Sequence, residues 1–106
     1  MAKRAWKMAE AGDYLYFEDY EQARNAALKW LEERGFVAEK QNLGKFHDAA
    51  GIPNGMQTAD GKIGFRVEFD ENVGAHINVR AGKEKGPHFL FSGSKEKVEP
   101  FQMRFR

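Results

Sequence analysis

Side chains that could do chemistry are concentrated between residues 74 and 91. This stretch holds two of the three histidines of the chain, together with one arginine and two lysines, and its polar set is His76, Asn78, Arg80, Lys83, Lys85 and His88. Histidine titrates near neutral pH and can give or take a proton, while arginine and lysine hold an anion. The stretch therefore predicts a site for an anionic substrate, with the ordinary solvated face of a half-buried sheet as the alternative.

Alternating polarity indicates how these side chains are positioned. Ala75 to Ala81 alternates small or apolar residues with polar ones, and His88 to Ser92 does the same, which is the period of a strand with one dry and one wet face. The glycines and the proline of residues 82–87 predict the turn between these two strands. A third strand, Ile63 to Asp70, precedes them. We expect an antiparallel meander whose polar faces coincide, which would add Arg66 and Glu68 to the site.

One helix is strongly indicated between Asp19 and Arg34. Asp19 can cap it, with Gln22 three residues later, and Gly35 can end it while Phe36 folds back. The stripe that faces the sheet recurs at three- and four-residue steps through Tyr20, Ala23, Ala27, Trp30, Leu31 and Arg34.

The remaining pattern is weaker. Before the Ile63 strand it predicts a short strand at Phe36 to Gln41, a loop at Asn42 to Asn54 with Phe46 anchored, and a hairpin from Gly55 to Thr58 into that strand. At the C-terminal end it predicts one helical turn at Lys95 to Val98, which Pro100 stops, and a last strand at Phe101 to Arg106. The fold class expected is α+β, with one N-terminal helix (or two) packed on a four- to five-stranded antiparallel sheet.

Size and composition narrow the function. At 106 residues and 12.1 kDa the chain is expected to be one domain, 1–106, with residues 1–18 as a mobile lead-in in which Ala2 to Ala11 is a weak helix or a mobile tail. The absence of cysteine excludes disulfides and thiolate chemistry, and no apolar run is long enough to span a membrane. A cytoplasmic site of action is expected. Net charge is only +1, but residues from Lys62 onward lean basic, as a phosphate site would.

The side-chain set suits metal-free cleavage of RNA. The 2′-hydroxyl needs a base, the departing 5′-oxygen needs an acid and the phosphate needs fixed positive charge. His76, His88, Glu68 and Arg80 are the catalytic candidates, and Arg66, Asn78, Lys83 and Lys85 are the substrate-binding candidates. We predict no metal and no cofactor, because a zinc site from the two histidines and a carboxylate lacks a telling spacing. The third histidine, His47, is expected to be a solvated loop residue.

A family resemblance points the same way. The segment Gly-Ala-His-Ile-Asn-Val-Arg-Ala-Gly-Lys-Glu-Lys-Gly-Pro-His-Phe, preceded by Gly-Lys-Ile-Gly-Phe-Arg-Val-Glu-Phe-Asp, resembles the C-terminal toxin modules of bacterial polymorphic toxins of the Rhs and contact-dependent inhibition type. The resemblance runs from about the Asp19 helix to Phe91. Many such modules are similar to the barnase, EndoU, colicin and RelE group of ribonucleases. The resemblance implies RNA as substrate, a cognate immunity protein as partner, and functional roles for Arg66, Glu68, His76, Arg80, Lys83, Lys85 and His88.

Two other classes of function stay open. A non-catalytic module could bind RNA or a protein through the same polar face, although its phenylalanines fall on the dry side, where they cannot stack on bases. A small partner or inhibitor protein would fit the acidic helix surface but leaves the histidines unexplained.

Overall fold

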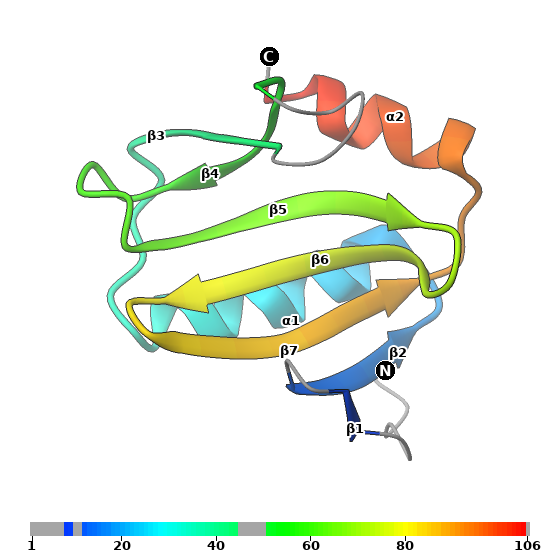
Figure 1. The fold of residues 1–106 in the computed structure, drawn as a ribbon, viewed down its shortest axis with the longest axis horizontal. Coiled ribbons are helices and arrows are strands. Elements are labelled where there is room, and N and C mark those ends of the chain that lie inside the picture. The colour runs from blue at the N-terminus through cyan, green and yellow to red at the C-terminus, as the bar shows by residue number, and fades with distance from the viewer. Residues whose placement is uncertain (1–7, 10–11, 45–50, 106) are drawn as a thin grey trace.

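A computed structural model describes residues 8–9, 12–44 and 51–105 of the chain. In this part, two helices pack against a mostly antiparallel sheet in an α+β arrangement (Figure 1). The elements, in chain order, are β1 (Met8–Ala9), β2 (Gly12–Phe17), α1 (Tyr20–Glu32), β3 (Lys40–Leu43), β4 (Pro53–Gln57), β5 (Ile63–Asp70), β6 (Gly74–Ala81), β7 (Glu84–Phe91) and α2 (Lys95–Met103).

The sheet is larger than the sequence predicted. Its order is β1-β2-β7-β6-β5-β4-β3, so seven strands are present among the described residues instead of four or five. Two of them, β1 and β2, precede the first helix. Strand β2 inserts beside β7 in parallel, and the other neighbouring pairs are antiparallel. The predicted lead-in is therefore partly sheet, at residues 8–9 and 12–17. Residues 1–7 and 10–11, and Phe46 and His47 of the predicted loop, lie outside the described residues.

The meander of β5, β6 and β7 is confirmed. Strand β5 has the predicted bounds, and Val67 lies opposite Ile77, which in turn lies opposite Phe89. The turn between β6 and β7 is shorter than the predicted 82–87: Ala81 already pairs with Glu84, and Gly82 adopts a φ of 63°. Strand β7 then continues through 86–87 with a register shift, so the glycine and proline there form a bulge in the strand and not a loop.

Helix α1 follows its sequence signals. Asp19 has an extended backbone and its side chain accepts a hydrogen bond from the backbone N–H of Gln22 (2.9 Å), which satisfies one free donor of the first turn. Gly35 has a φ of 91°, and the N–H of Phe36 reaches back to the carbonyl of Leu31 (3.1 Å). This is the glycine-dependent helix end that the sequence predicted.

Both helices contribute to one hydrophobic core on one face of the sheet. Helix α1 lies behind the meander in Figure 1, and α2 lies along the β4–β5 side. The core includes Tyr20, Ala23, Ala27, Leu31, Phe65, Val67, Ile77, Val79, Phe89, Phe91 and Val98. The predicted pairing of the helix stripe with the apolar sides of the three strands is therefore confirmed, with Phe65 and Ile77 on the same face.

The helical turn predicted at Lys95 to Val98 is confirmed, but its stop at Pro100 and the strand predicted after it are wrong. Residues 95–103 form a helix, α2, with Pro100 inside it, and the expected last strand at 101–106 is absent from the described residues up to 105. Val98, Phe101 and Phe105 recur at three- and four-residue steps, which is the period of a helical stripe. Phe101 and Phe105 also fit the two-residue period of a strand, and this is why a strand was predicted. Stacking of Phe101 on Tyr20, with ring centroids 4.0 Å apart, offsets the hydrogen bond that proline cannot donate.

The first predicted strand and hairpin are displaced by several residues. The strand expected at 36–41 begins at Lys40, and the one expected at 55–58 begins at Pro53, so part of the predicted loop is paired sheet. The turn at residues 59–61 is as predicted, with Gly61 at a φ of 74°. Neither described helix has the length and apolar character needed to cross a membrane.

Candidate functional site

The sheet face opposite the core carries its polar side chains in three rows that cross the strands. Pairing between neighbouring strands defines each row, because directly opposed residues point to the same side. The first row is Lys40, Gln57, Gly64, Arg80 and Lys85; the second is Asn42, Gly55, Arg66, Asn78, His88 and Tyr14; the third is Glu68, His76, Leu90 and Tyr16. The meander thus brings both histidines, from β6 and β7, to the same face as predicted.

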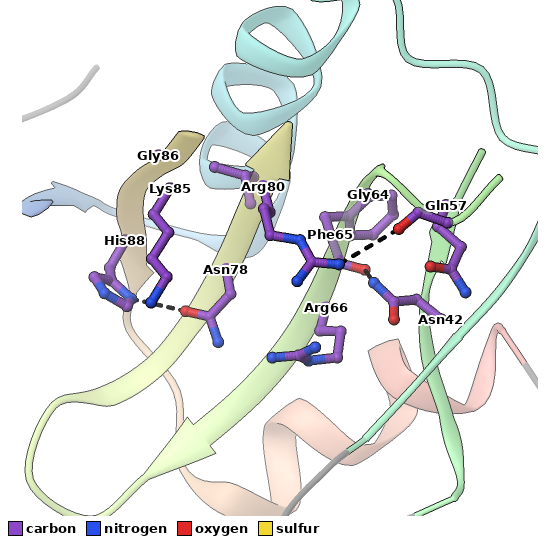
Figure 2. A pocket seen from close by; sticks show the side chains of 12 residues that line it. Asn42, Gln57, Gly64, Phe65, Arg66, Asn78, Arg80, Lys85, Gly86 and His88 are labelled. Atoms are coloured by element: carbon purple, nitrogen blue, oxygen red, sulfur yellow. Dashed lines mark hydrogen bonds between the residues drawn. The ribbon is translucent and has the colours of Figure 1, made fainter. Parts of the chain in front are cut away.

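A hollow of about 300 Å³ lies over the first two rows, beside Gly64 of the first row. Gly64 lies between Gln57 and Arg80 in the first row, and the side chain of Arg80 extends across this position to donate to the carbonyl oxygen of Gly61 (3.4 Å) (Figure 2). A side chain at Gly64 would also meet Gln57, since a Cβ there would lie 2.6 Å from the Cβ of Gln57. The glycine is therefore required both by the packing and by the shape of the hollow.

Positive charge dominates the lining of the hollow. Arg66, Arg80 and Lys85 contribute to its walls, while none of the carboxylates in the described part of the chain lines it. Arg66 is paired with Glu68 (3.1 Å) outside the lining, but no described carboxylate forms an ion pair with Arg80 or Lys85. Two uncompensated cations in a concave site favour an anionic ligand, and arginine can hold it with two parallel hydrogen bonds.

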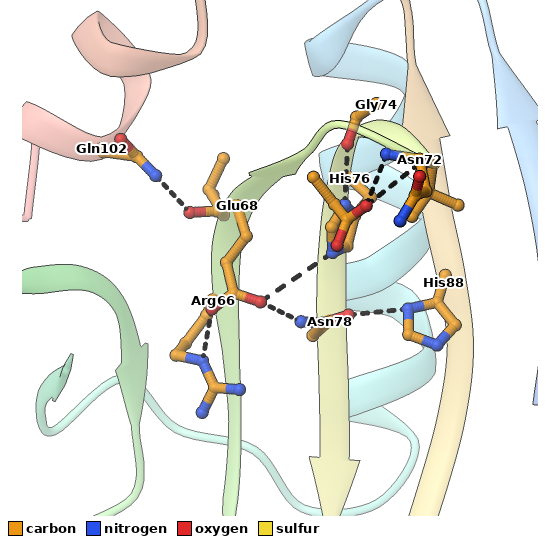
Figure 3. Close-up of polar contacts among 11 residues, drawn as sticks. Arg66, Glu68, Asn72, Gly74, His76, Asn78, His88 and Gln102 are labelled. Carbon is orange, nitrogen blue, oxygen red and sulfur yellow. Dashed lines mark hydrogen bonds and ion pairs between the residues drawn. The ribbon is translucent and has the colours of Figure 1, made fainter. Parts of the chain in front are cut away.

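A chain of hydrogen bonds fixes the orientation of His88. Glu68 accepts a hydrogen bond from the side-chain amide of Asn78, and the Oδ1 of Asn78 lies 2.7 Å from Nδ1 of His88 (Figure 3). Because an ionised carboxylate can only accept, the amide nitrogen of Asn78 faces Glu68 and its oxygen faces His88. Nδ1 of His88 must then be the protonated nitrogen, which leaves the lone pair on Nε2. The relay Glu68–Asn78–His88 thus holds a histidine with a basic nitrogen at the hollow.

The surroundings also keep His88 neutral. Burial lowers its pKa below the ordinary 6.5, the nearby His76 lowers it further, and the more distant charge of Glu68 acts in the opposite direction. The ring of Tyr14 packs edge-on against it at 5.2 Å between centroids, which contributes to that burial. A neutral imidazole with Nε2 unprotonated is the form that a general base requires.

His76 differs from the prediction, because it is buried and not partly exposed. Only 6% of the residue is accessible, and both ring nitrogens face protein groups. Nδ1 lies 2.9 Å from the carbonyl oxygen of Gly74 and therefore donates to it, while Nε2 lies 3.8 Å from Glu68. Its ring centroid is 5.7 Å from that of His88. His76 is thus placed to support the relay from behind, and it does not line the hollow.

A brace from helix α1 fixes the strand end that carries Lys85. Arg34 makes two hydrogen bonds to the carboxylate of Glu84 (3.0 and 3.1 Å), and its guanidinium lies 3.8 Å from the ring centre of Trp30. Trp30 in turn packs against Gly86, where a Cβ would approach the indole to 2.8 Å. The bulge between Lys85 and His88 is therefore clamped from the core side.

The predicted site residues are only partly brought together. Arg66, Asn78, Arg80, Lys85 and His88 line the hollow, and Glu68 and His76 lie directly behind them in the relay. Lys83 does not join them, because it occupies the exposed two-residue turn beyond the last strand pair.

Three polar-face residues were missed by sequence reasoning. Asn42 and Gln57 line the hollow from β3 and β4, and Tyr14 approaches from β2. Asn42 fell in a predicted loop. Gln57 carried a signal, since it lies in the predicted hairpin opposite the polar side of β5. Tyr14 carried none, because its pairing partner is 74 residues away in the sequence.

No group of three or more histidine, aspartate or glutamate side chains within the described ranges is arranged to hold a metal ion. Compared with known proteins, the chain matches no family model, and no curated protein matches it significantly.

Proposed function

We propose that this protein is an endoribonuclease that works without a metal ion and cleaves RNA by attack of the 2′-hydroxyl on the neighbouring phosphate. The observation that carries the proposal is the Glu68–Asn78–His88 relay, which presents a neutral Nε2 beside a cationic hollow. This reaction needs a base for the 2′-hydroxyl and fixed positive charge for the phosphate. DNA lacks the 2′-hydroxyl and therefore cannot react in this way.

Each residue has a distinct role in the proposed reaction. Nε2 of His88 takes the proton of the 2′-hydroxyl, and the 2′-oxygen bonds to phosphorus. Arg80 and Arg66 stabilise the added negative charge on the phosphate oxygens. The bond to the 5′-oxygen breaks, and that oxygen leaves with a proton from the ammonium group of Lys85, which produces a 2′,3′-cyclic phosphate and a 5′-hydroxyl.

Glu68 and Asn78 are positioning residues in this scheme. The amide nitrogen of Asn78 is bonded to Glu68 and its oxygen to His88, so the pair acts through His88 by selecting the protonation of Nδ1. This revises the prediction that Glu68 is a catalytic base and that Asn78 binds substrate. His76 is assigned a supporting role for the same reason: its Nδ1 donates to Gly74 and its Nε2 faces Glu68.

The sequence resemblance extends the proposal to biology. Similarity to toxin modules supports a role as a toxin domain that acts on RNA in the cytoplasm and is neutralised by a cognate immunity protein. The charge of the hollow supports an acidic surface on such a partner, because a carboxylate that occupied the phosphate position would block the site.

The test uses a short RNA of defined sequence, the DNA of the same sequence, and excess chelator. The proposal predicts that the RNA is cleaved, that the DNA is intact, and that the products end in 2′,3′-cyclic phosphate. His88→Ala should lower the rate by about 10² to 10⁴, as expected for loss of a general base. A protein that binds but never cleaves RNA under these conditions would contradict the proposal.

Binding of RNA without cleavage is the second candidate, and one observation favours it. Tyr14 places an aromatic ring on the polar face beside His88, where the sequence had suggested none. Aromatic rings on a cationic face are typical of proteins that bind single-stranded RNA by stacking. Wild-type protein and His88→Ala together separate the two functions. A ribonuclease cleaves RNA as wild type and loses most of that cleavage in the variant, whereas a binding module binds RNA and cleaves none in either form.

A further inference from the structure

Two amide side chains form the wall of the hollow that the proposed reaction does not use. Asn42 and Gln57 lie on the side away from Lys85 and His88, as Figure 2 shows. By strand pairing, Gln57 and Lys85 are three strands apart, which corresponds to roughly 14 Å between their backbones. A phosphate held near Lys85 and His88 would therefore leave space in front of the amides for another part of the same ligand.

The orientation of the two amides is fixed by the backbone. The NH₂ group of Asn42 donates to the carbonyl oxygen of Phe65 (3.1 Å), and that of Gln57 donates to the carbonyl oxygen of Gln41 (2.8 Å). Within the described ranges, neither side-chain oxygen accepts a hydrogen bond. The wall therefore presents two carbonyl oxygens, Oδ1 and Oε1, as acceptors for donors of a ligand.

The size of the hollow limits the ligand. A volume of about 300 Å³ lies at the lower end of the range for small-molecule sites, which suits one nucleotide and excludes a duplex. Gly64 adds no side chain to the floor of the hollow, so the space above its backbone is bounded by the side chains of Gln57 and Arg80. Lys85 and His88 at one end and the amide acceptors at the other match the phosphate and the base of a single nucleotide, and Arg80 lies between them, where its guanidinium donates to the carbonyl oxygen of Gly61 (3.4 Å).

We propose that the hollow is a subsite for one nucleotide of the RNA substrate, and that Asn42 and Gln57 select a base with an exocyclic amine. Adenine, cytosine and guanine each carry such an amine, which donates to carbonyl oxygens, whereas uracil has none: its one donor on that edge, N3–H, is flanked by two carbonyl oxygens that the amide oxygens would oppose. The inference rests on the proposed ribonuclease function for the nature of the ligand. It assigns to the site a preference against uridine.

Binding of non-cleavable nucleotides tests the subsite separately from catalysis. The 3′-monophosphates of deoxyadenosine, deoxycytidine, deoxyguanosine and deoxyuridine are titrated into the wild-type protein, with inorganic phosphate as the reference. We expect the deoxyuridine compound to bind about 3- to 10-fold more weakly than the other three nucleotides, as for the loss of one hydrogen bond. Equal affinity of all four, or tightest binding of deoxyuridine, would overturn the inference.

A pair of variants identifies the wall. Gln57→Met removes the acceptor at nearly the same side-chain length and should abolish most of the preference while phosphate binding is unchanged. Gln41→Met makes the same chemical change on the neighbouring strand, where the side chain points to the core side and contacts the backbone of Phe105, and it should leave the preference intact. A preference that survives Gln57→Met would overturn the assignment.

The two proposals fail in different ways. If RNA is not cleaved but the nucleotides bind with the expected order, the subsite stands and the ribonuclease function falls. If RNA is cleaved equally well next to all four bases, and the nucleotides bind equally, the ribonuclease function stands and the subsite falls.

Discussion

A methyl group at Gly86 should destabilise the protein, because this glycine lies between the sheet and helix α1. A Cβ there would lie 2.4 Å from Cγ2 of Val79 and 2.8 Å from a ring carbon of Trp30, well inside contact distance. Either the indole or β7 must move. We expect Gly86→Ala to lower the free energy of unfolding by about 1–3 kcal/mol, as for other overpacked cores, which urea denaturation at constant m-value would measure.

Two comparisons make this prediction specific. Gly93→Ala is the matched control, since a Cβ at Gly93 meets only ordinary contacts of 3.7 Å or more, and its stability should change little. In a Val79→Ala background, the cost of Gly86→Ala should shrink, because the closest clash is gone. If Gly86→Ala were as well tolerated as Gly93→Ala, or if its cost were unchanged by Val79→Ala, the proposed clamp on the bulge would be refuted.

Three further predictions concern stability. Burial and His76 lower the pKa of His88 in the folded protein, so the unfolded chain takes up a proton first as the pH falls. The contribution of His88 to the free energy of unfolding should therefore be fully present above about pH 6.5 and decline below it. His88→Gln should flatten that pH dependence, which urea titrations at several pH values would measure. Trp30→Ala should cost about 3–5 kcal/mol by the same assay, and a loss under about 1 kcal/mol would mean that the helix stripe is misassigned. Pro100→Ala should raise stability by about 1–3 kcal/mol, since it restores a helical N–H, and an unchanged melting temperature would count against this.

The local part of the fold was predictable from the sequence. Alternation along β5 and β6 specified both strands and their faces, because a one-residue slip would have moved the apolar side chains of β5, such as Phe65 and Val67, to the solvent side. The cap at Asp19 and the glycine after the helix specified α1 almost to the residue. The shared face of His76 and His88 followed from the alternation along β6 and β7.

The remainder depended on contacts between distant residues. Strand β2 is stabilised by pairing with β7 at the other end of the chain, which no local pattern reveals. Helix α2 depends on the stacking of Phe101 on Tyr20, and this overrides the signal of Pro100. His76 is buried although its position in the alternation is polar, because Glu68 and the carbonyl oxygen of Gly74 provide partners for its ring nitrogens.

Chemical rescue tests most directly the central claim that Nε2 of His88 is the general base. The variant His88→Ala is incubated with an RNA of defined sequence in chelator, with and without added imidazole, beside Arg80→Ala treated in the same way. The claim predicts that imidazole restores part of the lost cleavage in His88→Ala and none in Arg80→Ala, with the same cyclic phosphate products. Undiminished cleavage by His88→Ala in the absence of imidazole would contradict it.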